Sequence, residues 1–258
     1  MCLDGPVLAL GPIKQEESCV RKQSIDCESP AFEFAKIGVA IVPLFTKEQQ
    51  ALIEKFAKEW VYRLLSPWME GKEASRPLEM YHIWCRELPE EHRAALASKH
   101  RYMYPDPKIR DTIINAPMRE FLSMIGVTRW KVWDDGWGDV GFRLIRPAVG
   151  DGYPLCCKDW GKAKGVVSFW IPVIGRSSHE TLLIARGSHL RDYPRKMIEG
   201  KFFAHEPRFA GELTDLDLFR PDLRVGEAIA YQARTLHSED VTSSDITRLN
   251  LEIRFSPK

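Results

Sequence analysis

The C-terminal segment, residues 226–255, constrains the fold of this 258-residue chain more than any other part. Two strand-like runs, residues 226–231 and 247–255, are joined by a short polar connection. The first run leads into His237, and the second opens with Arg248 eleven positions after that histidine. A sheet that brings an imidazole and a guanidinium into one cavity can hold a metal ion and a carboxylate side by side.

Periodicity divides the rest of the chain into a helical part and a β-rich part. Thr46 and Gln49 have the spacing of a capping box, and apolar residues follow at helical spacing. We expect helices over about residues 46–126 and a β-rich core over about residues 129–256. Further strands are expected at about residues 140–147, 165–173 and 181–185. Many short strands with long insertions favour a mainly β fold of the sandwich or jelly-roll type, with flanking helices.

Composition indicates one globular domain. Residues 1–30 are polar and lack a hydrophobic period, so we expect a weakly ordered arm followed by a single domain over residues 31–258. A net charge of +1 argues against a nucleic-acid partner, and no apolar run is long enough for a membrane span. The arm has no apolar signal-peptide core, and the six cysteines are irregularly spaced. These features favour a cytoplasmic protein with reduced thiols; the oligomeric state is open.

Three segments extend the C-terminal pattern upstream. They read GFRLIRP at residues 141–147, SFWIPV at residues 168–173 and TLLIARGSH at residues 181–189. With the late His and Arg, they resemble in order the iron(II)/2-oxoglutarate dioxygenases, in particular the phytanoyl-CoA dioxygenase-like group. The resemblance covers residues 140–256 and implies a double-stranded β-helix, the jelly-roll or cupin-like fold. It also implies that His237 is an iron ligand, that Arg248 clamps the far carboxylate of 2-oxoglutarate, and that the segment with His189 supports the site.

The chain departs from this family where the other iron ligands are expected. The family carries His-x-Asp or His-x-Glu before the W-I-P segment, whereas residues 153–160 read YPLCCKDW and contain no His. In one register Cys157-Lys158-Asp159 replaces the motif and only the His is lost. In the other, Cys156-Cys157-Lys158 replaces it and the carboxylate is lost too. On the first register the resemblance implies a metal site of Asp159, His237 and Cys157, with a thiolate softer than the usual imidazole.

The candidate cofactor-binding residues, Arg248 and Trp170, each have a second interpretation. Strand alternation puts four polar residues on one face of the last strand: Arg248, Asn250, Glu252 and Arg254. That face fits a cavity lining, and it fits equally an outer face where Arg248 would pair with Asp245 or Glu252 in solvent. Trp170 lines a pocket in one interpretation and belongs to the core in the other.

Two functions remain open. The first is an oxygenase that uses iron(II) and 2-oxoglutarate to hydroxylate a small metabolite or sugar-like substrate. The second is a non-catalytic or non-redox jelly-roll relative that binds a carboxylate or glycan without redox-active iron.

Overall fold

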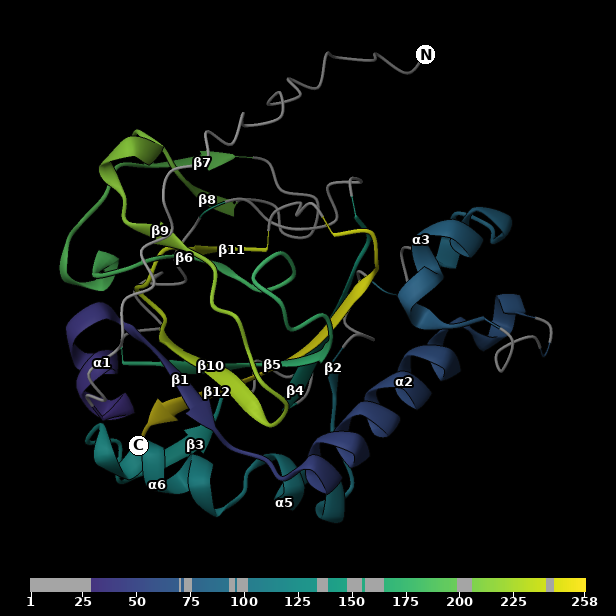
Figure 1. The fold of residues 1–258 in the computed structure, drawn as a ribbon, viewed down its shortest axis with the longest axis horizontal. Coiled ribbons are helices and arrows are strands. Elements are labelled where there is room, and N and C mark those ends of the chain that lie inside the picture. Colours follow the sequence, from purple (N-terminus) through teal and green to yellow (C-terminus); the bar gives the residue numbers. More distant parts are fainter. Residues whose placement is uncertain are drawn as a thin grey trace.

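A large antiparallel sheet dominates this computed structural model (Figure 1). The structure describes residues 29–69, 71, 76–92, 96, 102–133, 139–147, 155, 165–198, 206–239 and 244–258. The strands of the large sheet are β1 (Val39–Pro43), β2 (Tyr102–Met103), β3 (Trp130–Val132), β4 (Val140–Ile145), β5 (Val167–Ile174), β10 (Glu227–Gln232) and β12 (Arg248–Pro257). Their order is β1-β10-β5-β12-β4-β2, and β3 pairs with β12. The ten-residue β12 is therefore central, between β5 and β4.

A smaller sheet covers one face of the large one. It consists of β6 (Leu183–Ala185), β9 (Leu218–Phe219) and β11 (His237–Ser238), in the order β11-β6-β9. A separate pair, β7 (Arg195–Ile198) and β8 (Glu206–Phe209), lies beyond it (Figure 1). Ile184 of the small sheet packs in one cluster with Trp170 and Tyr231 of the large sheet. Two facing antiparallel sheets confirm the predicted mainly β, double-stranded β-helix fold.

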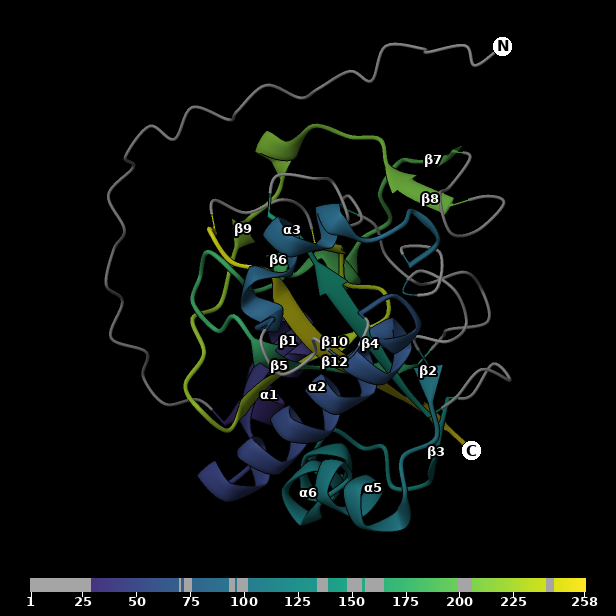
Figure 2. The ribbon, with the colours of Figure 1, turned by 90° about the vertical axis from the view of Figure 1, so that its right-hand side faces the viewer.

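Helices cover the opposite face of the large sheet (Figure 2). They are α1 (Pro30–Ile37), α2 (Lys47–Met69), α5 (Pro107–Ile113) and α6 (Ala116–Met124). The shorter helical segments are the four-residue α-helix α3 (Tyr81–Trp84) and the 3-10 helices η2 (Leu78–Met80), η3 (Cys85–Glu87), η5 (Ser188–Leu190) and η6 (Leu213–Asp215). The predicted capping box is present: Gln49 N donates to Thr46 Oγ1 at 3.2 Å, and Thr46 N donates to Gln49 Oε1 at 2.9 Å. Among the helices described, none is both long and apolar enough to cross a membrane.

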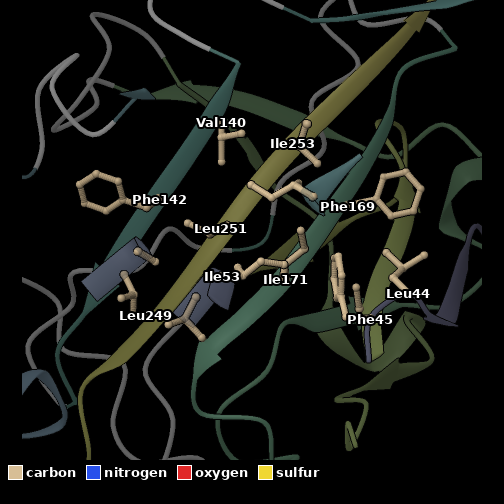
Figure 3. Close-up of a cluster of buried hydrophobic side chains, with 14 of the residues drawn as sticks. Leu44, Phe45, Ile53, Val140, Phe142, Phe169, Ile171, Leu249, Leu251 and Ile253 are labelled. Atoms are coloured by element: carbon tan, nitrogen blue, oxygen red, sulfur yellow. The ribbon is translucent and has the colours of Figure 1, made fainter. Parts of the chain in front are cut away.

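The main hydrophobic core lies between these helices and the large sheet (Figure 3). Alternate residues of β12 point into it, and Leu249, Leu251 and Ile253 are fully buried. Phe169 of β5 meets Phe121 of α6 and Phe255 of β12 edge to face, at centroid distances of 5.8 and 5.7 Å. Because one face of β12 packs in this core, the side chains of its other face point toward the small sheet.

We expect Phe169→Ala to lower the free energy of unfolding by about 3–5 kcal/mol, because it leaves a cavity between the helices and the sheet. Urea denaturation monitored by circular dichroism measures the change. Leu190→Ala is the control, since Leu190 is 68% exposed and its loss should change stability by less than about 0.5 kcal/mol. Equal effects of the two substitutions would contradict this location of the core.

Candidate functional site

The face of β12 that points toward the small sheet is polar, and it is buried. Arg248, Asn250 and Glu252 are 3%, 1% and 7% exposed. The interpretation of this face as an outer, solvated surface is therefore wrong. Buried charges and amides are costly unless they are paired, so their presence between two sheets calls for partners or a ligand.

His237 is fully buried, and the backbone sets its tautomer. It opens β11 opposite Ile184, which packs in the cluster between the sheets. Its Nδ1 lies 2.8 Å from the carbonyl oxygen of Thr235, which can only accept, so Nδ1 carries the proton. The Nε2 atom of the neutral ring then has the lone pair that a metal ligand requires. The ring lies against Tyr231, with centroids 4.6 Å apart.

The Gly187-Ser188-His189 segment supports the strand that carries His237. Ser188 Oγ donates to the carbonyl of Ala185 at 2.7 Å and accepts from Leu236 N at 2.8 Å. The imidazole of His189 lies 3.1 Å, through Nε2, from the carbonyl of Ala35 in α1. These contacts fit the expectation that this segment orders the surroundings of the site.

Arg248 anchors its guanidinium on two backbone carbonyls. It donates to the carbonyl of Glu180 at 3.0 Å and to that of Glu239 at 2.9 Å. Glu239 lies two residues after His237, so the guanidinium reaches from β12 to the end of β11. This contact brings the segments of the two sequence-predicted residues, His237 and Arg248, together between the sheets.

Two buried glutamates, Glu239 and Glu252, belong to the polar interior. Sequence reasoning did not identify Glu239, and it named Glu252 only as part of the polar face of the last strand. Glu239 is 2% exposed and lies 3.1 Å from Arg143 Nε. Its other oxygen accepts from Trp170 Nε1 at 3.1 Å, so the polar atom of this candidate residue is engaged by the protein. The sequence signal for Glu239 is its His-x-Glu spacing, which would put both side chains on one face of an extended strand, whereas β11 ends at Ser238.

Glu252 forms the second polar centre of the interior. It accepts from Arg254 through both carboxylate oxygens, at 3.0 and 3.1 Å, and from the Tyr231 hydroxyl at 2.8 Å. Arg254 is thus a described partner of Glu252, in place of the surface pair with Arg248 that the sequence allowed. Burial raises the pKa of Tyr231 well above its ordinary range, and the charge of Glu252 adds to the shift. Tyr231 therefore stays a neutral hydrogen-bond donor.

Asn250 presents a buried amide donor between the charged residues. Among the residues that the structure describes, its Nδ2 atom has no acceptor. On β12 it lies opposite Arg143 of β4 and Pro172 of β5. The β12–β5 register shifts between Leu249, opposite Ile174, and Asn250, opposite Pro172, so Val173 is skipped; Pro172 has no N–H for the ladder. An amide donor beside guanidinium groups suits an acceptor that carries negative charge.

The remaining metal-ligand candidates, Cys157 and Asp159, lie outside the described residues. Within the described part of the chain, no three His, Cys, Asp or Glu side chains gather in a way that could hold a metal ion. His237 is the one sequence-predicted ligand that the structure describes.

We expect Tyr231→Phe to lower the free energy of unfolding by about 1–3 kcal/mol, because it removes a donor from a buried carboxylate. Urea denaturation of the variant measures this loss. Tyr62→Phe is the matched control: the Tyr62 hydroxyl donates to the neutral carbonyl of Arg76 at 2.8 Å and is only half-buried. A loss at Tyr231 no larger than that at Tyr62 would argue against a charged acceptor.

His189 should make stability depend on pH. Burial lowers its pKa below the ordinary 6.5; the carbonyl of Ala35 opposes this shift, and the charge of Arg234 adds to it. As the pH falls through 6.5, the unfolded chain binds a proton that the folded protein still excludes, so the free energy of unfolding decreases. We expect His189→Gln to show a shallower decrease than wild type in urea titrations between about pH 8 and pH 5. Parallel curves would contradict the lowered pKa.

Comparisons with known proteins identify the fold. No family model matches the chain, and no curated protein matches it. SnoN, a non-heme alpha ketoglutarate dependent epimerase from nogalamycin biosynthesis, is 14% identical with a TM-score of 0.56, covering 88% of this chain and 82% of that one. AviO1 from Streptomyces viridochromogenes Tue57 is 13% identical with a TM-score of 0.55, covering 91% and 96%. EctD from S. alaskensis is 11% identical with a TM-score of 0.56, covering 91% and 78%. At these identities the similarity establishes a shared fold, and no more.

Proposed function

We propose that the protein is a non-haem iron(II)/2-oxoglutarate-dependent oxygenase that hydroxylates a small metabolite or sugar-like substrate, with an atypical metal site. One observation carries the proposal: a tautomer-fixed imidazole and a polar strand face with Arg248 and Asn250 are buried together between two sheets. Similar folds support it, since SnoN has been solved with Fe3+ and alpha ketoglutarate and EctD with 2-oxoglutarate. The segments around residues 168–189 favour the phytanoyl-CoA dioxygenase-like group.

The described residues fit the metal in part. His237 would bind iron through Nε2, because its Nδ1–H is held by the Thr235 carbonyl. Asp159 would supply the carboxylate, and Cys157 would stand where the family has its other imidazole. A site of imidazole, carboxylate and thiolate can bind iron(II), although the softer sulfur alters its preference.

The described residues also fit a dicarboxylate cosubstrate. Arg248 would hold the far carboxylate, and the Nδ2 atom of Asn250, two residues along the same face, would donate to it. Trp170 would contribute its ring face to the wall, since its N–H is engaged by Glu239. Bound iron and 2-oxoglutarate supply the oxidising chemistry; the protein binds, orients and excludes water.

A single domain over residues 31–258 would act in the cytoplasm on a small-molecule or glycan substrate, without nucleic-acid or membrane partners.

A second candidate is a non-catalytic relative that binds a carboxylate or glycan. The replacement of His-x-Asp by Cys157-Lys158-Asp159 favours it. The interior also contains Glu239 and Glu252, both already paired with arginines. On this proposal the same donors, Arg248 and Asn250, would hold a ligand carboxylate without redox chemistry.

Anaerobic titration with iron(II) and 2-oxoglutarate distinguishes the two candidates. We expect a weak visible charge-transfer band for wild type and its loss in His237→Ala, with no loss in the control His179→Ala, whose side chain is exposed. No band for wild type, combined with binding of 2-oxoglutarate alone, would favour the second candidate.

The role of Arg248 is tested by Arg248→Lys. Loss of a two-point contact with a carboxylate should weaken 2-oxoglutarate binding by about 10- to 100-fold, the equivalent of about 1.5–3 kcal/mol. Isothermal titration calorimetry measures the change, with Arg186→Lys, at a partly exposed surface pair with Asp217, as control. Unchanged affinity in Arg248→Lys would remove the cosubstrate role.

The metal-site register is tested by substitution at its two proposed positions. Cys157→His should raise iron(II) affinity, since imidazole is a better-matched ligand, and Asp159→Ala should abolish iron binding. Equilibrium dialysis under anaerobic conditions measures both. If neither wild type nor Cys157→His holds iron, the register is wrong or the site does not bind metal.

A further inference from the structure

We infer that Glu239 is a positioning residue that fastens the end of β11 to the large sheet and thereby sets the placement of His237 and Arg248. The inference rests on the proposed function, in which these two residues hold iron and 2-oxoglutarate. It assigns to Glu239 no direct contact with either.

Glu239 bridges the small sheet to three neighbouring strands. Its backbone carbonyl accepts from Arg248 of β12, its Oε1 accepts from Trp170 of β5, and its Oε2 pairs with Arg143 of β4. These strands are adjacent in the order β5-β12-β4. The pair with Arg143 is an ion pair: the atoms lie 3.1 Å apart, but the N–H is not directed at the oxygen as in a hydrogen bond.

In the described part of the chain, the strand that carries His237 has a short ladder, supported by the contact of Ser188 Oγ with the backbone of Leu236. β11 contains two residues and pairs there with β6 alone, through His237–Ile184 and Ser238–Leu183. Glu239 directly follows β11 and is two residues from His237, so a shift of Glu239 is passed to His237 through Ser238 alone. The contacts of the Glu239 side chain therefore help to set the position of the imidazole.

The cost of burying Glu239 also indicates a positioning role. It is 2% exposed, and a buried ion pair contributes little net stability compared with an apolar replacement. Such groups are retained in some proteins because they select one arrangement of the surrounding chain. Both carboxylate oxygens are engaged by the large sheet, so Glu239 acts through the groups that it holds.

The test compares Glu239→Ala and Glu239→Gln with Asp139→Asn. Asp139 pairs with Arg110 at 2.8 Å, away from His237 and Arg248, and is the control for losing an arginine–carboxylate pair. We expect Glu239→Ala to weaken the binding of iron(II) and of 2-oxoglutarate by about 10- to 100-fold, as for other residues that orient metal ligands. Glu239→Gln, which keeps an acceptor for Trp170, should recover part of this loss. Asp139→Asn should change neither affinity.

A purely structural role predicts another pattern. If Glu239→Ala lowers the melting temperature but the folded protein keeps both affinities and the KM for 2-oxoglutarate, the inference is overturned. A fall in kcat with unchanged KM and unchanged iron affinity would also overturn it, because it would indicate participation in the reaction itself.

A metal-independent measurement separates this inference from the proposed function. The imidazole NMR signals of His237, assigned with His237→Gln, should shift in Glu239→Ala and remain in place in Asp139→Asn. If wild type binds neither iron nor 2-oxoglutarate, the proposed function fails, and the NMR result alone decides whether Glu239 positions His237. Unshifted signals would refute the positioning role.

Discussion

The structure depends on the two-sided character of β12, its central ten-residue strand. Every second side chain enters the hydrophobic core under the helices, and the residues between them enter the space under the small sheet. Side chains alternate between the two faces of a strand. Packing of the apolar face in the core therefore also determines which residues point toward the small sheet. The core made by Leu249, Leu251 and Ile253 is thus what holds Arg248, Asn250 and Glu252 in place.

Burial of charge in this interior is expensive, and the structure offsets the cost by pairing. Glu252 is held by Arg254 and Tyr231, and Glu239 by Arg143 and Trp170. Such networks contribute less to stability than a well-packed apolar core of the same volume. The protein is therefore less stable than it would be with an apolar interior, but its polar groups are held in defined positions. This combination is common at binding and catalytic sites.

The sequence predicted the elements whose pattern is local and missed those that depend on packing. The capping box at Thr46, the helix that follows it and the strands β4, β5, β6, β10 and β12 all have a local sequence pattern, and all are present. The polar face of β12 was undecidable, since a solvated face and a cavity lining have the same alternation. β11 has only two residues, and Glu239 begins a polar stretch of sequence. Both are therefore predicted as loop from the sequence. Their roles come from contacts far apart in the sequence.

The register shift beside Pro172 has a structural consequence. A continuous ladder would pair β12 with β5 residue by residue, but the register shift skips Val173, between the pairs Leu249–Ile174 and Asn250–Pro172. The carbonyl of Pro172 turns instead to the side chain of Gln50 in α2, which donates to it at 2.8 Å. This hydrogen bond adds a polar link between α2 and the part of β5 opposite Asn250, beside the apolar packing of the helix on the sheet.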